Sequence, residues 1–280
     1  MTTTTAETTL VYPADETWQG FTGVHGGVVV AALLAAADAL VPGTPATITT
    51  HFLAPVPPGD LLVDAALVHP GRTAAVTARI GTAVTGLVRV VRPASARPSA
   101  APGTPPGRAD AGTAGTGDTG TGAAGGVAPA WPLPDAAPEP EACPRLDLPV
   151  QLVPVGQHFE IRPVSASRPL AGGDEPAFDV WIRLRPAVFT QRAFAAPEAA
   201  AILLDALPPG LFATLRRPVP IPTAELTAHF TPVGYRPDGW FRLRQRTAWA
   251  TADLCVDETE LRTADGELAA QARQLRRIVR

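Results

Sequence analysis

The fold is decided by residues 26–40, which read G-G-V-V-V-A-A-L-L-A-A-A-D-A-L. The two glycines open a helix that is apolar on every side, and a helix of this kind has to be buried all round. Four segments with the composition of strands follow it, separated by Pro-Gly and Gly-Thr turn signals, at 46–53, 61–68, 73–80 and 84–91. A helix followed by an antiparallel meander predicts a complete small domain in which the sheet wraps the helix.

A second helix is predicted within residues 197–209, which read P-E-A-A-A-I-L-L-D-A-L-P-P. Proline suits the first helical position, alanine and leucine are strong helix formers, and the paired prolines end the helix. Strands are expected before this helix at 158–162 and 179–185, and after it at 224–230, 240–250, 254–262 and 267–279. The second half therefore repeats the order of the first, a helix and then four strands.

A shared string supports an internal duplication. The first long strand after each helix carries T-H-F-L-A-P-V at 50–56 and A-H-F-T-P-V at 228–233. We predict an α+β fold of two repeats, at 10–92 and 146–280, each an antiparallel sheet wrapped around a central helix. The two sheets are expected to lie edge to edge, because this arrangement leaves fewer bare strand edges.

Residues 93–145 are expected to form a disordered linker, because they hold almost no large apolar side chains to offset chain entropy. The Thr-rich residues 1–9 are expected to be frayed. The string G-T-G-D-T-G at 115–120 matches the dinucleotide-binding fingerprint formally, but neither a strand nor a helix flanks it. We therefore predict no cofactor.

The composition argues against several classes of protein. A net charge of -3 argues against a nucleic-acid binder. The two cysteines, Cys143 and Cys255, make neither a disulfide framework nor a metal set, and no G-x-S-x-G motif indicates a serine hydrolase. The first residues lack the pattern of a signal peptide, and no apolar run reaches about 18 residues. We expect a cytoplasmic protein that does not contact the membrane.

Two polar side chains stand in apolar surroundings. Asp205 lies near the negative end of the second helix, where the helix dipole and burial both disfavour a charged carboxylate. Asp205 is therefore either a functional residue or a residue of an exposed last helical turn. Gln274 shares one strand face with apolar and mostly small neighbours, where an amide needs a buried partner. A backbone carbonyl group without another hydrogen-bond partner would satisfy the Gln274 amide as well as a ligand would.

Six strings follow one another in the order of a known family. They are G-V-H-G-G-V-V-V-A-A-L (23–33), H-F-L-A-P-V-P-P-G (51–59), G-R-T-A-A-V-T-A-R-I (71–80), F-E-I-R-P-V (159–164), V-W-I-R-L-R (180–185) and the Asp-bearing helix. Together they resemble the double-hotdog acyl-CoA thioesterases of the bacterial thioesterase II type. The resemblance implies a double hotdog fold, an acyl-CoA substrate and a homo-oligomer.

The resemblance also implies a set of site residues. By similarity, the catalytic groups that hold the attacking water are Asp205, Thr223 and Gln274. Without the family, a Thr after Pro222 is more often a plain strand start than a ligand. The amides of Gly26 and Gly27 are candidates to polarise the thioester carbonyl, although close packing of helix against sheet would also explain these glycines. We expect His25, beside them, to contact the substrate.

The expected function is hydrolysis of an acyl-CoA thioester to free acid and CoA by water that Asp205 activates. Two alternatives stay open: a hotdog enoyl-CoA hydratase, and a non-catalytic acyl-thioester binder, since Val28 replaces a glutamine common in the family. Two groups of arginines are either solvated or face the phosphates of CoA: Arg242, Arg244 and Arg246 in one strand, and Arg273, Arg276, Arg277 and Arg280 at the C-terminus.

Overall fold

The computed structural model describes residues 6–93 and 137–279. The strands are β1 (Glu7–Ala14), β2 (Thr44–Phe52), β3 (Gly59–His69), β4 (Thr73–Ile80), β5 (Val84–Val91), β6 (Phe159–Pro163), β7 (Ala177–Leu184), β8 (Thr223–Phe230), β9 (Phe241–Ala250), β10 (Leu254–Thr263) and β11 (Leu268–Arg277). The α-helices are α1 (Gly26–Leu40), α2 (Pro186–Gln191) and α3 (Ala196–Leu204). Short 3-10 helices are η1 (Glu16–Trp18), η2 (Pro140–Ala142), η3 (Pro154–His158) and η4 (Gly210–Ala213).

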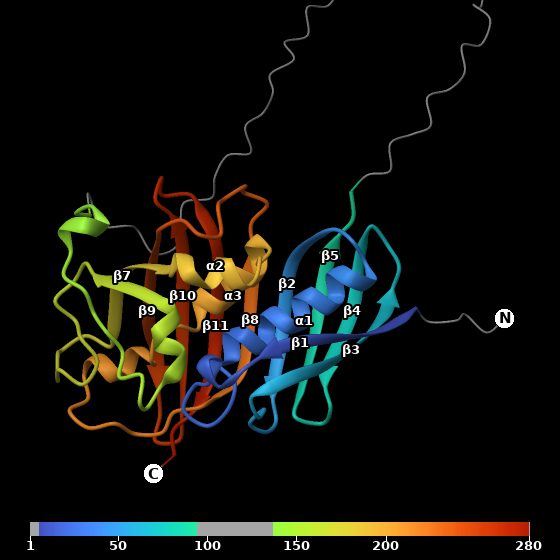
Figure 1. The fold of residues 1–280 in the computed structure, drawn as a ribbon. Coiled ribbons are helices and arrows are strands. Elements are labelled where there is room, and N and C mark those ends of the chain that lie inside the picture. The colour runs from blue at the N-terminus through green and yellow to red at the C-terminus, as the bar shows by residue number, and fades with distance from the viewer. Residues whose placement is uncertain (1–5, 94–136, 280) are drawn as a thin grey trace, which may run out of the picture. The chain divides into compact units, whose positions relative to one another are not determined.

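The eleven strands of the described residues form one antiparallel sheet in the order β1-β3-β4-β5-β2-β8-β11-β10-β9-β7-β6 (Figure 1). The first five belong to the first half of the chain and the last six to the second half, so the halves meet where β2 pairs with β8. At the centre of this seam Thr49 lies opposite Thr227, and their hydroxyl oxygens are 3.1 Å apart. The predicted edge-to-edge arrangement of two helix-bearing sheets is confirmed.

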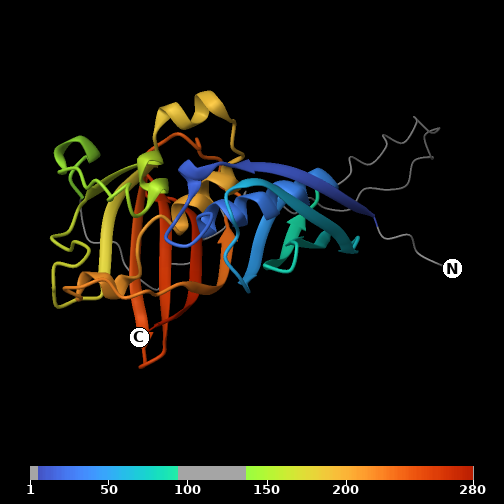
Figure 2. The same ribbon diagram turned by 60° about the horizontal axis from the view of Figure 1, so that its bottom comes forward.

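The helices α1 and α3 lie on the same side of the sheet and pack against each other (Figures 1 and 2). Helix α1 contacts β1 to β5, and ten of its fifteen residues are buried, which agrees with its apolar sequence. Helix α3 contacts β7, β10 and β11, and the apolar face of each half of the sheet closes over its helix. No helix in the described residues is long and apolar enough to cross a membrane.

The beginning of the chain differs from the expectation. Residues 7–9, predicted to be frayed, belong to β1, which pairs with β3 over its whole length. Tyr12 and Ala14 of β1 are buried against the core, so this strand covers an edge that β3 would otherwise expose. Helix α2 was also not predicted, because its six residues are too few to show a helical period.

Most of the segment predicted to be a linker, residues 94–136 with the G-T-G-D-T-G string, lies outside the described residues. Its last part is described and packs against the second half. The Trp181 indole donates a hydrogen bond to the Pro138 carbonyl oxygen at 2.8 Å, and Cys143 is buried. The described structure therefore resumes before the predicted boundary at residue 146.

Candidate active site

Asp205 sits at the C-terminal end of α3, where two prolines prevent the helix from continuing. Its side chain is only 9% exposed, and both carboxylate oxygens are held. The Gly27 backbone N–H donates to Oδ2 at 3.0 Å, and the Gln274 amide Nε2 donates to Oδ1 at 3.1 Å. The carboxylate thus faces the start of α1 and the inner surface of β11, and not bulk solvent.

Thr223 and Gln274 come from the adjacent strands β8 and β11, and Gln274 contacts Asp205 while Thr223 contacts Gln274. Gln274 is fully buried on the inner face of β11, as the alternation of that strand predicts. The Thr223 hydroxyl is 3.4 Å from the Gln274 Oε1 atom, next to an irregularity in the pairing of β8 with β11. The structure therefore brings the three predicted catalytic residues together from a helix and two strands.

The adjacent glycines at the start of α1 meet different neighbours. A Cβ atom added to Gly26 would lie 2.7 Å from Asp205 Oδ2. A Cβ atom added to Gly27 would lie 2.6 Å from the Ala201 carbonyl oxygen of α3. The Gly27 amide, expected to polarise a substrate carbonyl, instead donates to Asp205.

His25 precedes α1 and is 7% exposed. Its Nε2 atom is 2.8 Å from the Asp205 carbonyl oxygen and 3.5 Å from Asp205 Oδ2. A carbonyl oxygen only accepts, so Nε2 carries the proton of this hydrogen bond. The buried Nδ1 atom has no hydrogen-bond partner among the described residues.

Two charged groups at this site were not predicted, because the sequence analysis assigned Arg276 to solvent or to CoA phosphates and did not consider Asp257. Arg276 is 5% exposed, and its Nη1 atom donates to the Thr223 hydroxyl at 2.9 Å. Its Nε atom is 2.7 Å from Oδ2 of Asp257, a fully buried residue of β10. The N–H direction misses that oxygen, so the contact is a close ion pair without an aligned hydrogen bond. The sequence did contain a signal that Arg276 belongs to this site. A residue two positions after Gln274 points to the same face of the strand.

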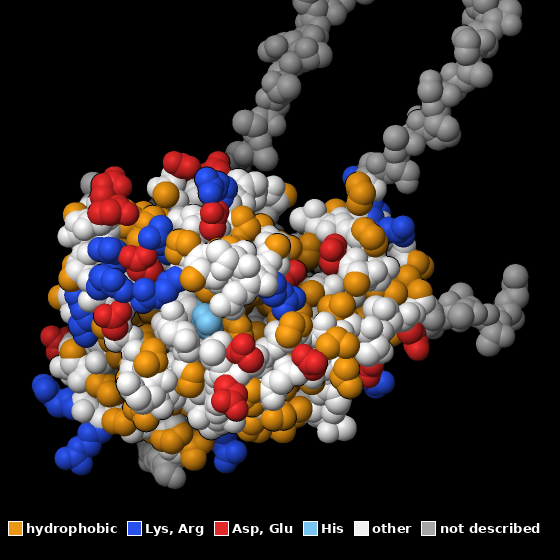
Figure 3. Space-filling model, in the orientation of Figure 1, with side chains coloured by type: hydrophobic (Ala, Val, Ile, Leu, Met, Phe, Trp, Pro, Cys, Tyr) orange, Lys and Arg blue, Asp and Glu red, His pale blue; other side chains and the backbone are white. Residues whose placement is uncertain are grey.

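Arg276 is therefore not part of an open phosphate-binding group. Arg242, in the other arginine group, is buried and forms a bidentate pair with Asp179. Arg246 is paired with Glu258. Figure 3 shows basic and acidic side chains intermixed on the part of the surface where blue atoms gather. Arg280 lies outside the described residues.

The thiol nearest to this site is not a nucleophile. Cys255 lies opposite Arg276 in the pairing of β10 with β11. Burial, and then the nearby charge of Asp257, raise the pKa of Cys255 to about 11, so the thiol keeps its proton at neutral pH. In the described residues no three His, Cys, Asp or Glu side chains are grouped closely enough to hold a metal ion.

The first half contains a counterpart of the site. In the pairing of β2 with β5, Pro45 lies opposite Val90, just as Thr223 lies opposite Arg276 in the pairing of β8 with β11. In both pairings an irregularity in the register lies directly next to this residue pair. Val88 occupies the place of Gln274, and Val76 that of Asp257. The helix sequences match too, with D-A-L-V-P-G at 38–43 and D-A-L-P-P-G at 205–210.

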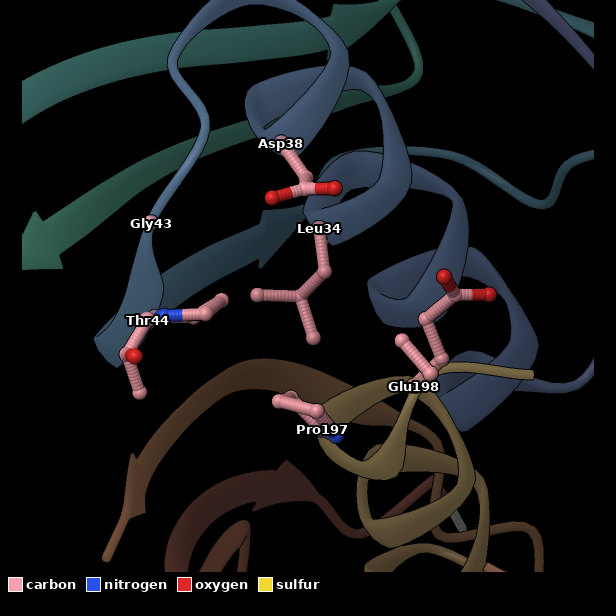
Figure 4. Close-up of a pocket in the computed structure, with 8 residues that line it drawn as sticks. Leu34, Asp38, Gly43, Thr44, Pro197 and Glu198 are labelled. Carbon is pink, nitrogen blue, oxygen red and sulfur yellow. The ribbon is translucent and has the colours of Figure 1, made fainter. Parts of the chain in front are cut away.

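A cleft of about 170 Å³ lies at this counterpart and not at Asp205 (Figure 4). It is lined by Leu34, Asp38, Gly43, Thr44, Pro45, Ala195, Pro197 and Glu198. Because Pro45 and Val88 replace the hydroxyl and the amide, the first half keeps only the carboxylate of the trio. The complete set of three exists at the Asp205 end.

Family models match both halves of the chain. They describe an acyl-CoA thioesterase N-terminal domain over residues 14–91 and an acyl-CoA thioesterase C-terminal domain over residues 133–278. A comparison with curated protein sequences found no match.

Solved structures share the fold. A conserved hot dog protein from Alicyclobacillus acidocaldarius has a TM-score of 0.70 at 20% identity, over 98% of this chain and 94% of that chain. An acyl-CoA thioesterase II from Mycobacterium marinum has a TM-score of 0.58 at 18% identity, over 92% and 90%. The dehydratase domain of PpsC from Mycobacterium tuberculosis, in complex with C12:1-CoA, has a TM-score of 0.57 at 16% identity, over 98% and 93%.

These structural likenesses establish the fold, and the family matches over both halves establish the class of enzyme. The chain belongs to the acyl-CoA thioesterase family and is a thioester hydrolase with a double hotdog fold.

Proposed function

We propose that the chain hydrolyses an acyl-CoA thioester to free acid and CoA, with Asp205 as the general base. The observation that carries this proposal is the buried carboxylate of Asp205, held by the Gly27 amide and the Gln274 side chain. Fixed donors on both oxygens hold the carboxylate in one orientation. Such a group can accept a proton from water as the water attacks the thioester carbon.

The neighbouring groups have roles that follow from their geometry. Gln274 supplies an amide next to the carboxylate and Thr223 a hydroxyl next to that amide, and these groups would orient the attacking water and so raise the rate through positioning. The Gly26 amide is our candidate donor to the thioester oxygen, because the Gly27 amide already serves Asp205. The unpartnered Nδ1 atom of His25 supports a contact with the substrate.

Replacing Asp205 tests the proposal. Asp205→Asn keeps the shape of the side chain and removes the base, so kcat should fall by about 100-fold or more. Thiol release from short, branched, aromatic and long acyl-CoAs, followed with a chromogenic thiol reagent, measures this loss and also defines the acyl preference. A wild-type rate in the variant would remove Asp205 from the mechanism.

The chain offers a matched control at Asp38, the counterpart of Asp205 in the first half. Asp38→Asn changes the same type of residue at the equivalent helix end, where Pro45 and Val88 take the places of Thr223 and Gln274. Its kcat should equal that of the wild type. An equal loss in both variants would point to a general effect on the fold.

Hydration of an enoyl-CoA is the second candidate function. The observation that favours it is the 3.5 Å distance between His25 Nε2 and Asp205 Oδ2, since an imidazole beside a carboxylate can exchange protons with a substrate. Loss of the enoyl absorbance without thiol release would identify a hydratase. Acyl-CoA binding without either reaction would identify a non-catalytic binder. Assembly as a homo-oligomer and a cytoplasmic location stay predictions.

A further inference from the structure

A buried ion pair stands next to the proposed catalytic trio without belonging to it. Arg276 and Asp257 are 5% and 0% exposed, and they face each other between β11 and β10. The Asp257 Oδ1 atom also accepts a hydrogen bond from the Thr247 hydroxyl at 2.6 Å, and the Thr247 oxygen accepts from the Leu211 amide at 2.9 Å. The carboxylate of Asp257 is therefore fixed from η4 and β9 as well as by the arginine.

The pair imposes a direction on the hydrogen bonds of the site. A guanidinium only donates, so the Thr223 oxygen accepts from Arg276 Nη1. The single hydroxyl proton of Thr223 is then directed to the Gln274 Oε1 atom. With its oxygen engaged, the Gln274 amide presents Nε2 to Asp205. A reversed amide would place an oxygen against the carboxylate, which is repulsive.

Arg276 also contributes charge close to the base. Its Nη2 atom is 3.6 Å from Asp205 Oδ1, and this atom has no aligned hydrogen bond within the described residues. On the other side of the guanidinium, the Nε atom is 2.7 Å from Asp257 Oδ2, so the arginine lies between two carboxylates and closer to Asp257. The arginine therefore holds Thr223 without donating an aligned hydrogen bond to the carboxylate of Asp205.

The first half indicates that the fold does not need this pair. At the equivalent positions it has Val76 and Val90, both fully buried in the same strand pairing. Replacing a buried ion pair with apolar side chains is often neutral or stabilising, whereas removing one partner leaves a buried charge and is costly. The ion pair of Arg276 and Asp257 occurs only in the half of the molecule that contains the proposed catalytic trio. A role in the reaction at the trio therefore explains the pair better than a contribution to stability does.

We propose that Arg276, anchored by Asp257, is a positioning residue that sets the Thr223 hydroxyl and the Gln274 amide in the orientation that hydrolysis requires. This inference rests on the proposed function of Asp205. Arg276 acts through Thr223, and it takes no proton from the water.

The double variant D257V/R276V tests the proposal without leaving a buried charge, because it reproduces the pair of valines in the first half. We expect it to keep the wild-type melting temperature within a few degrees and its KM within about threefold, while kcat falls by about tenfold or more. A kcat equal to that of the wild type would overturn the proposal.

A second pair of variants keeps the test decisive if the double valine variant does not fold. R276K keeps the charge but cannot hold Asp257 and Thr223 together, so kcat should fall by about three- to tenfold. In a T223V background the same R276K change should have no further effect, because the hydroxyl through which Arg276 acts is gone. Equal effects of R276K with and without Thr223 would contradict the proposal.

Arg277 supplies the control, since it is exposed on the opposite face of β11, and R277K should leave kcat unchanged.

The failure of this inference is distinguishable from the failure of the proposed function. A wild-type chain that releases no thiol from any acyl-CoA of the panel removes both, whereas an active wild type with an equally active D257V/R276V variant removes only the positioning role.

Discussion

Two adjacent glycines at the start of α1 are required for different reasons. Gly26 leaves room for the carboxylate of Asp205, and Gly27 leaves room for the backbone of α3. The first requirement concerns the end of a side chain, which can turn away at small cost. The second concerns two helices in close contact, in which neither backbone can move independently. The pair therefore gives the Asp205 carboxylate its space and lets α1 pack closely against α3, whereas the sequence suggested close packing against the sheet.

Alanine at each glycine should separate these functions. Gly26→Ala should displace the Asp205 carboxylate and lower kcat by about tenfold or more, with little change in stability. Gly27→Ala should lower the free energy of unfolding by about 2 to 4 kcal/mol, because its Cβ atom would meet the Ala201 carbonyl oxygen. Urea unfolding and thiol-release assays on both variants measure the two effects. The opposite result, an unstable Gly26 variant and an inactive but stable Gly27 variant, would refute this assignment.

At the scale of the element, α3 carries one acidic side chain near each end. Glu198 lies in the first turn, where the helix dipole favours a negative charge, but the side chain is only 13% exposed. Burial raises the pKa of Glu198 to about 7 and outweighs the opposing charge of Arg192, whose Nη2 atom is 4.0 Å from Oε2. A carboxyl group with a raised pKa makes the stability of the fold depend on pH.

The fold should lose stability as the pH rises from about 4.5 to about 7. Over this interval folded Glu198 keeps its proton while the unfolded chain releases it, so the folded state binds more protons. Glu198→Gln should remove this contribution, which amounts to at most about 3 kcal/mol at pH 8. Urea unfolding at pH 5 and pH 8 measures it. The exposed Glu16→Gln is the control, and an unchanged pH dependence in the Glu198 variant would refute the argument.

At the scale of the whole molecule, the seam between β2 and β8 unites the two halves in one sheet. The candidate site uses both halves, because His25 and Gly27 come from the first and Asp205, Thr223 and Gln274 from the second. A core defect in the first half should therefore be transmitted to the site. The shared sheet and the packed helices indicate a single cooperative unit.

Ile48 tests this cooperativity, since it is fully buried in β2 and pairs with β8 at Ala228. Ile48→Ala should lower the free energy of unfolding by about 2 to 4 kcal/mol through the cavity that it leaves. Tryptophan fluorescence, with Trp181, Trp240 and Trp249 in the second half, should then report the same urea midpoint as the loss of activity. Two separate transitions, with activity lost before the fluorescence change, would show halves that unfold independently.

Much of the fold was accessible from local patterns. The bounds of β4 and β5 agree with the prediction, and those of α1 do as well, because apolar periodicity and turn residues act over a few positions. Strand β1 was missed because it begins within the Thr-rich residues 1–9 and pairs with β3, some fifty residues later, which no local pattern indicates.

By itself the sequence determined the doubled helix-and-sheet plan, the family, and the three residue types of the candidate trio, since each of these is encoded in short strings of neighbouring residues. Only the tertiary structure decided that Asp257 faces Arg276, that the Gly27 amide serves Asp205, and that the first half keeps a carboxylate without its partners. These contacts join strands and helices far apart along the chain, and they depend on strand register and helix packing, which no local pattern specifies.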